Sequence, residues 1–168
     1  DAVGRLHLDL IGDGPLREDL EQLAVRLGIA DRVRFLGSRT EAEVREALSD
    51  ADLFVLPSVV AADGQMEGLP VALMESLACG VPTVSTDLSG IPEIVIDHAT
   101  GFLARPGDVH DLHRTLRDAI DRHTPAMSES GRSLVAEAFD IATTTSRLVE
   151  LLSEPVSAEP ADDAPESR

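Results

Sequence analysis

The chain has 168 residues, 43% of them hydrophobic, which is enough for the core of one α/β domain and excludes a fully disordered chain. Its 14 basic residues, all arginine, stand against 31 acidic residues and give a net charge of −17. Nucleic acids and anionic membranes attract clustered cations, so we expect neither as a partner. With 2% aromatic residues and no Trp or Tyr, platforms for stacking bases or sugars are missing too.

Cysteine usage and hydropathy bear on where the protein works. Cys79 is the single cysteine and has no partner for an internal disulfide, which is typical of a reduced, cytosolic chain. No signal-peptide pattern opens the sequence, and the longest uncharged apolar stretch, 53–62, is too short to span a bilayer. We therefore expect a cytoplasmic protein with no transmembrane segment. Because the chain starts at Asp1 rather than at Met, we also interpret it as a candidate truncated piece.

The first fifty residues predict two units, each a strand followed by a helix. Leucines alternate with polar residues in the first strand, and apolar residues recur at helical spacing in the first helix. Gly28 ends that helix, and Thr40 with Glu43 forms a capping-box pattern at the start of the second. The expected elements are a strand over 6–11, a turn at 12–15, a helix over 15–27, a strand over 33–37 and a helix after residue 40.

The rest of the chain predicts three more strands and four helices. The unbroken apolar run Leu53–Leu56 is typical of a strand covered on both faces, and Asp108 is placed to cap a helix. The apolar face of that helix is predicted from Val109, Leu112, Leu116, Ala119 and Ile120. The other expected elements are a helix over 69–79, strands over 83–85 and 101–103, and helices over 125–139 and 143–152.

Strands that alternate with helices across short loops indicate a doubly wound parallel sheet. We therefore expect an α/β fold, a Rossmann-like parallel sheet with helices on both faces, over residues 1–152. Residues 153–168 are rich in Pro, Ala, Ser and acidic residues, and we expect them to form a disordered acidic tail.

The segment 67–75 carries the most informative pattern. Glu67 and Glu75 lie eight positions apart across the start of a helix, with Pro70 suited to its first turn. The amides of Gly68, Leu69 and Val71 at this helix start have no helical partner and favour phosphate, which the helix dipole also attracts. A carboxylate repels phosphate, so the two glutamates are better suited to accept hydrogen bonds from hydroxyl groups. Either glutamate alone is more simply explained as a solvated residue, but the whole string fits a nucleotide sugar.

This string and five other segments resemble the retaining glycosyltransferases of family 4, specifically the C-terminal, donor-binding domain of their two-domain GT-B architecture. The order and spacing agree with the family from about Leu6 to Leu152. Residues 61–70 look like the subgroup that builds bacterial exopolysaccharides of the colanic-acid type. The six matching segments are 11–15, 33–37, 51–58, 67–75, 80–86 and 89–93.

The resemblance implies transfer of a hexose from a nucleotide-diphosphate sugar to a glycan or lipid-linked acceptor, with retention, in cell-surface polysaccharide biosynthesis. Glu67 matches the first Glu of the family's paired-Glu motif and is the expected catalytic residue near the donor sugar and phosphates. Glu75 matches the second Glu, which holds the ribose hydroxyls. Gly68 and Leu69 would offer amides to the diphosphate, and Gly37 would lie near the base. The family needs no bound metal, so we expect no cofactor beyond the donor substrate.

The chain also departs from the family. The family's donor domain opens with a further central strand and helix that carry Arg and Lys for the diphosphate, and Gly4-Arg5 lies too close to Gly12 to match them. Loss of that first strand would leave two unpaired strand edges. The acceptor-binding N-terminal domain is missing as well. The alternative function is therefore a truncated, catalytically incompetent nucleotide-binding module that needs a partner subunit.

Other kinds of site have less support in the sequence. Gly12 and Gly14 begin a dinucleotide fingerprint, but Arg17 replaces its third glycine, which disfavours half of a nicotinamide-dependent dehydrogenase or epimerase. A Walker loop requires Lys. His110 and His113 share a helix face without a third ligand, so we expect no metal site. No serine stands at a recognisable spacing from a histidine for a hydrolase triad.

Overall fold

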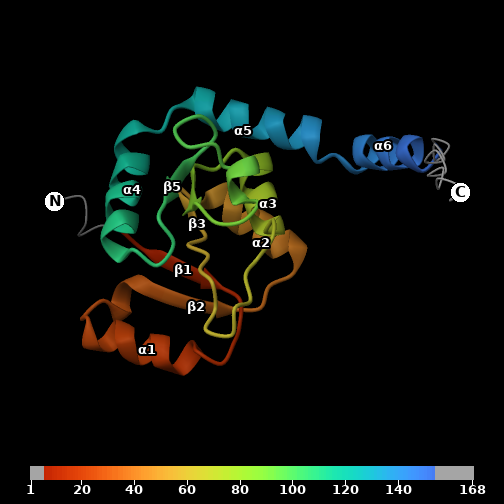
Figure 1. Cartoon of the computed structure of the whole chain (residues 1–168). Helices are drawn as coiled ribbons and strands as arrows, with labels where there is room; N and C mark the ends of the chain where they lie inside the picture. Colours follow the sequence, from red (N-terminus) through yellow and green to blue (C-terminus); the bar gives the residue numbers. More distant parts are fainter. Residues whose placement is uncertain (1–5, 154–168) are drawn as a thin grey trace, which may run out of the picture.

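The computed structural model describes residues 6–153 (Figure 1). Strands and helices alternate in the order that the sequence predicts. The first elements are β1 (Leu8–Ile11), α1 (Arg17–Arg26), the 3-10 turn η2 (Ala30–Arg32), β2 (Val33–Gly37) and α2 (Glu41–Asp50). They are followed by β3 (Phe54–Val55), α3 (Val71–Cys79), β4 (Thr83–Thr86), the 3-10 turn η3 (Ile91–Glu93), β5 (Phe102–Ala104), α4 (Val109–Arg122), α5 (Pro125–Ala138) and α6 (Ile141–Ser153).

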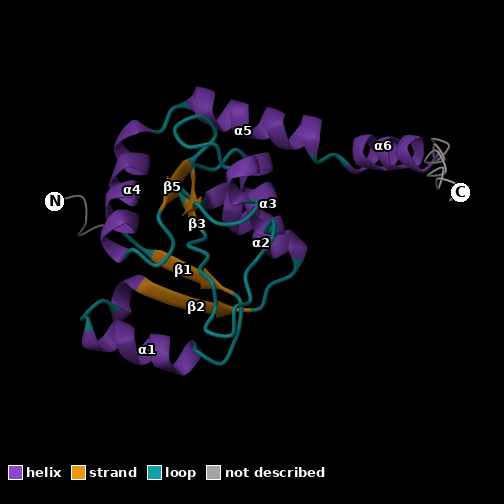
Figure 2. Ribbon diagram, in the orientation of Figure 1, coloured by secondary structure: helices purple, strands orange, loops and turns teal. Residues whose placement is uncertain are grey.

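All strand pairs between these elements are parallel, as expected, but they form two sheets rather than one (Figure 2). β1 pairs with β2 in the first sheet, and the second has the order β3-β4-β5. Within the described residues each sheet keeps two unpaired edges, at β1 and β2 in the first sheet and at β3 and β5 in the second. A central strand between β1 and β3, expected from the resemblance, stays a prediction.

Helices cover both faces of the three-stranded sheet, which confirms the predicted architecture. Successive residues of the β3 segment point to opposite faces, as the pleat requires. Phe54 and Leu56 pack against a core that contains Leu73 and Leu77 of α3. On the other face, Val55 packs in the core that includes Ala119 of α4. The carboxyl ends of these strands are thus set on a rigid, two-sided scaffold.

β3 is covered on both faces, as predicted, but as an edge strand it is only half-buried, whereas all four residues of β4 are buried. Two local predictions are wrong in detail. The apolar face of α4 is narrower than predicted, since Val109 is 76% exposed and Ile120 is 50% exposed. Helix α3 begins at Val71, with Pro70 as its N-cap in an extended conformation (φ −65°, ψ 126°) rather than in its first turn.

Two predicted helix starts are confirmed by side-chain contacts. Thr40 and Glu43 form the capping box of α2. Asp108 accepts a hydrogen bond from the backbone of Asp111 at the start of α4. The buried Asp111 carboxylate in turn accepts from the Arg105 amide at 2.8 Å, and this bond holds the pKa of Asp111 below its ordinary value. The loop after β5 is thereby closed onto α4.

The last two helices differ in how they pack. α5 lies along α3, where Gly131 leaves no room for a side chain: a Cβ there would come within 2.8 Å of Leu77. α6 buries no residue and extends away from the rest of the molecule (Figure 1). The predicted disordered tail covers 153–168; Ser153 is the last residue of α6, and residues 154–168 lie outside the described residues. No helix of the described part is long and apolar enough to cross a membrane.

Candidate functional site

The segment 67–75 lies between the end of β3 and the body of α3, next to the loop that follows β4 (Figure 1). In open parallel α/β sheets, ligands bind outside the carboxyl ends of the strands. Both neighbouring strands reach this segment with their carboxyl ends. The location is therefore the one that the fold offers to a ligand.

The Glu67 carboxylate is exposed and is held by one hydrogen bond. The Ser58 hydroxyl, just beyond β3, donates to Oε2 of Glu67 at 2.6 Å. Ser58 is itself held, because its carbonyl accepts a hydrogen bond of 2.6 Å from the hydroxyl of the buried Thr86 at the end of β4. A side chain on a loop is thus connected to the most deeply buried strand of the sheet.

The backbone at Gly68 is held from the opposite side. Its carbonyl accepts a hydrogen bond from the Gly90 amide at 3.0 Å. A Cβ added to Gly90 would lie 3.0 Å from the same carbonyl oxygen, so a side chain at this position would press on the Gly68 peptide. Ser89, which precedes Gly90, has the left-handed φ of 53°, a conformation that non-glycine residues adopt rarely. The loop after β4 thus fixes the peptide that joins Gly68 to Leu69.

The predicted phosphate-binding amides have no acceptor among the described residues. The backbone N–H groups of Gly68, Leu69 and Val71 make no hydrogen bond to protein atoms there, whereas the Leu73 amide bonds to the Pro70 carbonyl at 3.1 Å. Unpaired donors at the start of a helix, together with the helix dipole, favour an anion. Whether these amides bind phosphate stays a prediction.

Glu75 lies one turn into α3 and is half-buried. It makes no hydrogen bond or ion pair with any described residue, so its carboxylate can accept hydrogen bonds from a ligand. Glu67 forms no ion pair either, and no arginine of the described part is ion-paired with this segment. Two carboxylates without cationic partners fit hydroxyl groups better than phosphate.

Gly37 lies at the carboxyl end of β2 in the two-stranded sheet, and no hydrogen bond joins it to the segment 67–75. It has φ +69°, and its carbonyl accepts from the Gly12 amide at 2.9 Å. Beside it, Arg17 donates to the Phe35 carbonyl at 3.1 Å and stands over the Phe35 ring at 5.9 Å. The role of Gly37 near a nucleotide base stays a prediction.

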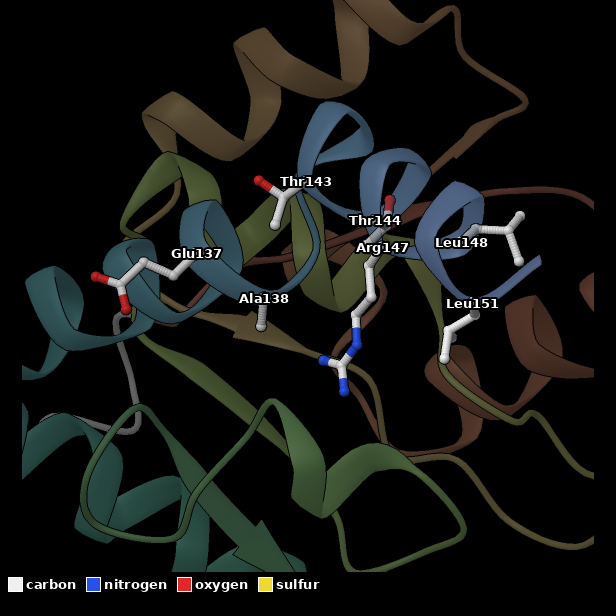
Figure 3. Close-up of a pocket in the computed structure, with 7 residues that line it drawn as sticks. All are labelled: Glu137, Ala138, Thr143, Thr144, Arg147, Leu148 and Leu151. Atoms are coloured by element: carbon white, nitrogen blue, oxygen red, sulfur yellow. The ribbon is translucent and has the colours of Figure 1, made fainter. Parts of the chain in front are cut away.

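Among the described residues, the structure adds no support for the other kinds of site. No group of three or more His, Cys, Asp or Glu side chains in residues 6–153 could hold a metal ion. A hollow of about 350 Å³ lies between α5 and α6, where Arg147 points into it (Figure 3). It contains none of the predicted site residues. Its lining is Glu137, Ala138, Thr143, Thr144, Arg147, Leu148 and Leu151.

Sequence reasoning missed three residues that hold the segment in place: Ser58, Thr86 and Gly90. Each lies in a segment that carries the family resemblance, but no local pattern pairs it with Glu67 or Gly68. The contacts join residues that are 9 positions apart for Ser58 and Glu67 and 28 apart for Ser58 and Thr86. The one available signal was their position, since each follows or ends a predicted strand.

Comparison with known proteins identifies the chain's relatives. AmsK, an amylovoran biosynthesis glycosyltransferase of Erwinia amylovora, is 42% identical over 109 residues, which cover 65% of this chain and 27% of AmsK. WcaL of Salmonella typhimurium, named as a colanic acid biosynthesis glycosyltransferase, is 38% identical over 146 residues, 85% of this chain and 36% of WcaL. The crystal structure of Anabaena Alr3699/HepE with UDP and glucose matches with a TM-score of 0.76 and 26% identity over 91% of this chain and 43% of that one.

The chain therefore spans less than half the length of these relatives. The family model described as glycosyl transferases group 1 matches residues 2–133, which is most of the chain. Its α/β fold with parallel strands is also that of the solved GT-B enzymes it resembles. The chain belongs to the group 1 family of glycosyl transferases.

Proposed function

We propose that this chain is the donor-binding part of a retaining, family 4 glycosyltransferase that moves a hexose from a nucleoside diphosphate sugar to a glycan or lipid-linked acceptor. One observation carries the proposal: the segment 67–75 presents two carboxylates without cationic partners beside three amides without acceptors. Carboxylates suit sugar and ribose hydroxyls, and amides suit a diphosphate. The names of AmsK and WcaL support a role in polysaccharide biosynthesis. The proposal adds that the polysaccharide belongs to the cell surface and that the enzyme works in the cytoplasm.

Each group would have a distinct task in the transfer. The diphosphate gains negative charge as it leaves the sugar, and the amides of Gly68, Leu69 and Val71 with the dipole of α3 would stabilise that charge. Glu67 would accept hydrogen bonds from the donor sugar, and Glu75 from the ribose. The proposal includes no metal ion. The acceptor would be bound by a further, N-terminal domain.

Calorimetric titration of the purified chain with UDP, GDP and ADP, in a buffer without added metal, tests the proposal. HepE was solved with UDP, so UDP is tested first. We expect one nucleotide to bind and its affinity to fall about tenfold in Glu75→Ala, the effect of losing a charged hydrogen bond. Glu46→Ala, which removes an exposed glutamate from α2, is the matched control and should bind like the wild type.

A chain that is folded by circular dichroism but binds none of the three nucleotides would contradict a donor site that works on its own. That result would favour the second candidate, a catalytically incompetent module that needs a partner subunit. This candidate is supported by the division of the parallel strands into two sheets within the described residues. An adjacent reading frame that encodes an acceptor-binding domain would support the same candidate.

A further inference from the structure

We infer that Ser58 is a positioning residue of the donor site: its hydroxyl holds the Glu67 carboxylate in the orientation that receives the sugar of a nucleoside diphosphate sugar. The inference rests on the proposed function. It adds a residue outside the segment 67–75 and a specific task, which is discrimination between a nucleoside diphosphate and its sugar conjugate.

The backbone of Ser58 is held by hydrogen bonds at both its amide and its carbonyl. Its amide donates to the Leu56 carbonyl at 3.0 Å, and its carbonyl accepts from the Thr86 hydroxyl at 2.6 Å. Thr86 is 2% exposed and belongs to the buried strand β4. Leu56 is joined to the same strand, because its amide donates to the Val84 carbonyl at 3.0 Å. The Ser58 side chain therefore starts from a rigid backbone although it lies in a loop.

The hydrogen bond from Ser58 orients the Glu67 carboxylate and leaves one of its oxygens open. A serine hydroxyl has one hydrogen, and here it is directed at Oε2 of Glu67 over 2.6 Å, within the range of hydrogen bonds to a charged acceptor. Oε1 receives no donor from the described residues and is left for a ligand. An exposed glutamate on a loop otherwise samples several rotamers, and ordering it on binding would weaken affinity. Ser58 holds one rotamer before the ligand arrives.

The backbone that follows Glu67 is held independently of Ser58. The Gly90 amide holds the Gly68 carbonyl at 3.0 Å. In a trans peptide the following N–H points away from that carbonyl, so the Leu69 amide is directed away from the Gly90 loop. The orientation of this amide does not depend on Ser58. Removing the Ser58 hydroxyl should therefore affect the contacts of the Glu67 side chain and spare those of the backbone amides.

Because the Glu67 side chain and the backbone amides are held independently, comparing the affinities for a nucleotide and for its sugar conjugate tests the inference. Titration calorimetry on the full chain measures the affinity for the nucleoside diphosphate that binds, among UDP, GDP and ADP, and for its conjugate, UDP-glucose, GDP-mannose or ADP-glucose. For Ser58→Ala we expect an unchanged affinity for the nucleotide and about tenfold weaker binding of the conjugate, the loss of one oriented charged hydrogen bond. Ser58→Thr keeps the hydroxyl and should restore the affinity for the conjugate.

The matched control is Ser85→Ala. The Ser85 hydroxyl donates to the Leu56 carbonyl at 2.7 Å, so this variant loses a hydrogen bond at the same strand end without touching Glu67. It should keep the wild-type ratio of the two affinities. In a double-mutant cycle, Ser58→Ala should have little further effect on the ratio once Glu67→Gln is present.

Several outcomes would overturn the inference. If Ser58→Ala weakens the nucleotide and its conjugate equally, with a lower melting temperature by circular dichroism, Ser58 only stabilises the loop. If the ratio of affinities in Ser58→Ala equals that of the wild type, Ser58 does not orient Glu67. A wild-type chain that binds the nucleotide but shows either result leaves the proposed function standing, whereas one that binds no nucleotide or conjugate overturns both.

Discussion

The Ser128 hydroxyl donates a hydrogen bond of 2.6 Å to the Gly80 carbonyl, which joins two residues 48 positions apart. Gly80 is the left-handed C-cap of α3 (φ 74°), so the contact satisfies a carbonyl at the end of the helix that carries Glu75. Arg132 supports the same helix end, since it donates to the Ala78 carbonyl at 3.3 Å. α5 therefore anchors the carboxyl end of α3, opposite to the end where we place the ligand.

Loss of this anchor should reduce stability but not ligand affinity. Ser128→Ala removes the bond to Gly80, and we expect the free energy of unfolding to fall by about 1–2 kcal/mol. Urea unfolding followed by circular dichroism measures it, because the chain has no Trp or Tyr for fluorescence. Ser130→Ala, an exposed position on the same helix, is the control and should unfold like the wild type. Equal stability of the two variants would contradict an anchoring role.

A second prediction concerns pH and His123, which contacts the same serine. The single hydroxyl hydrogen of Ser128 points to Gly80, so its oxygen accepts from Nε2–H of His123 at 2.9 Å. Desolvation by burial lowers the pKa of His123 below its ordinary value. Between the lowered pKa and about 6.5, the unfolded chain binds more protons than the folded one. Stability should therefore fall as the pH drops from about 7 through 6.5 to the folded-state pKa.

His123→Gln tests this relation, because glutamine keeps an N–H donor but does not titrate. Its free energy of unfolding should decrease less than that of the wild type when urea titrations are compared at pH 7.5 and 5.5. His113→Gln removes an exposed histidine from α4 and should keep the wild-type pH dependence. An unchanged slope in His123→Gln would show that another group sets the dependence in this range.

Local signals predicted most of the elements. The capping box of Thr40 and Glu43, the Asp108 cap and the order of strands and helices follow from short-range chemistry, and all are confirmed. The exposure of Val109 was not predicted, because spacing shows which residues share a helix face but not how much of that face a neighbouring element covers. Helix α3 begins at Val71 rather than at residue 69, because Pro70 adopts an extended ψ and precedes the helix.

The sequence predicted the segment 67–75 of the candidate site, but not the residues from other loops that hold this segment in place. The pattern from Glu67 to Glu75 marks carboxylates and helix-terminal amides within one stretch of chain. The contacts that hold this stretch come from other strand ends, at Ser58, Thr86 and Gly90. Such pairings depend on how parallel strands bring distant loops together, and no local spacing encodes them.

The last prediction tests whether Gly68 is needed for folding or for binding the ligand. Gly68 has no left-handed φ, and a Cβ built on it meets no protein atom within 4 Å. The fold therefore gives no reason for a glycine here, whereas close approach of a diphosphate to the backbone does. Gly68→Ala should leave the free energy of unfolding within about 0.5 kcal/mol of the wild type. Its affinity for the nucleotide that binds the wild type should fall about tenfold or more, because the methyl group would occupy the ligand's space.

Gly14→Ala is the matched control, since Gly14 is equally open and also lacks a left-handed φ. It lies in the turn after β1, and we expect it to keep both stability and nucleotide affinity. Thermal unfolding by circular dichroism and calorimetric titration on the same protein samples measure the two quantities. If Gly68→Ala binds nucleotide as tightly as the wild type, the diphosphate does not approach the backbone at the start of α3. The phosphate site would then have to lie elsewhere along the carboxyl ends of the strands, away from the Gly68 peptide that Gly90 holds.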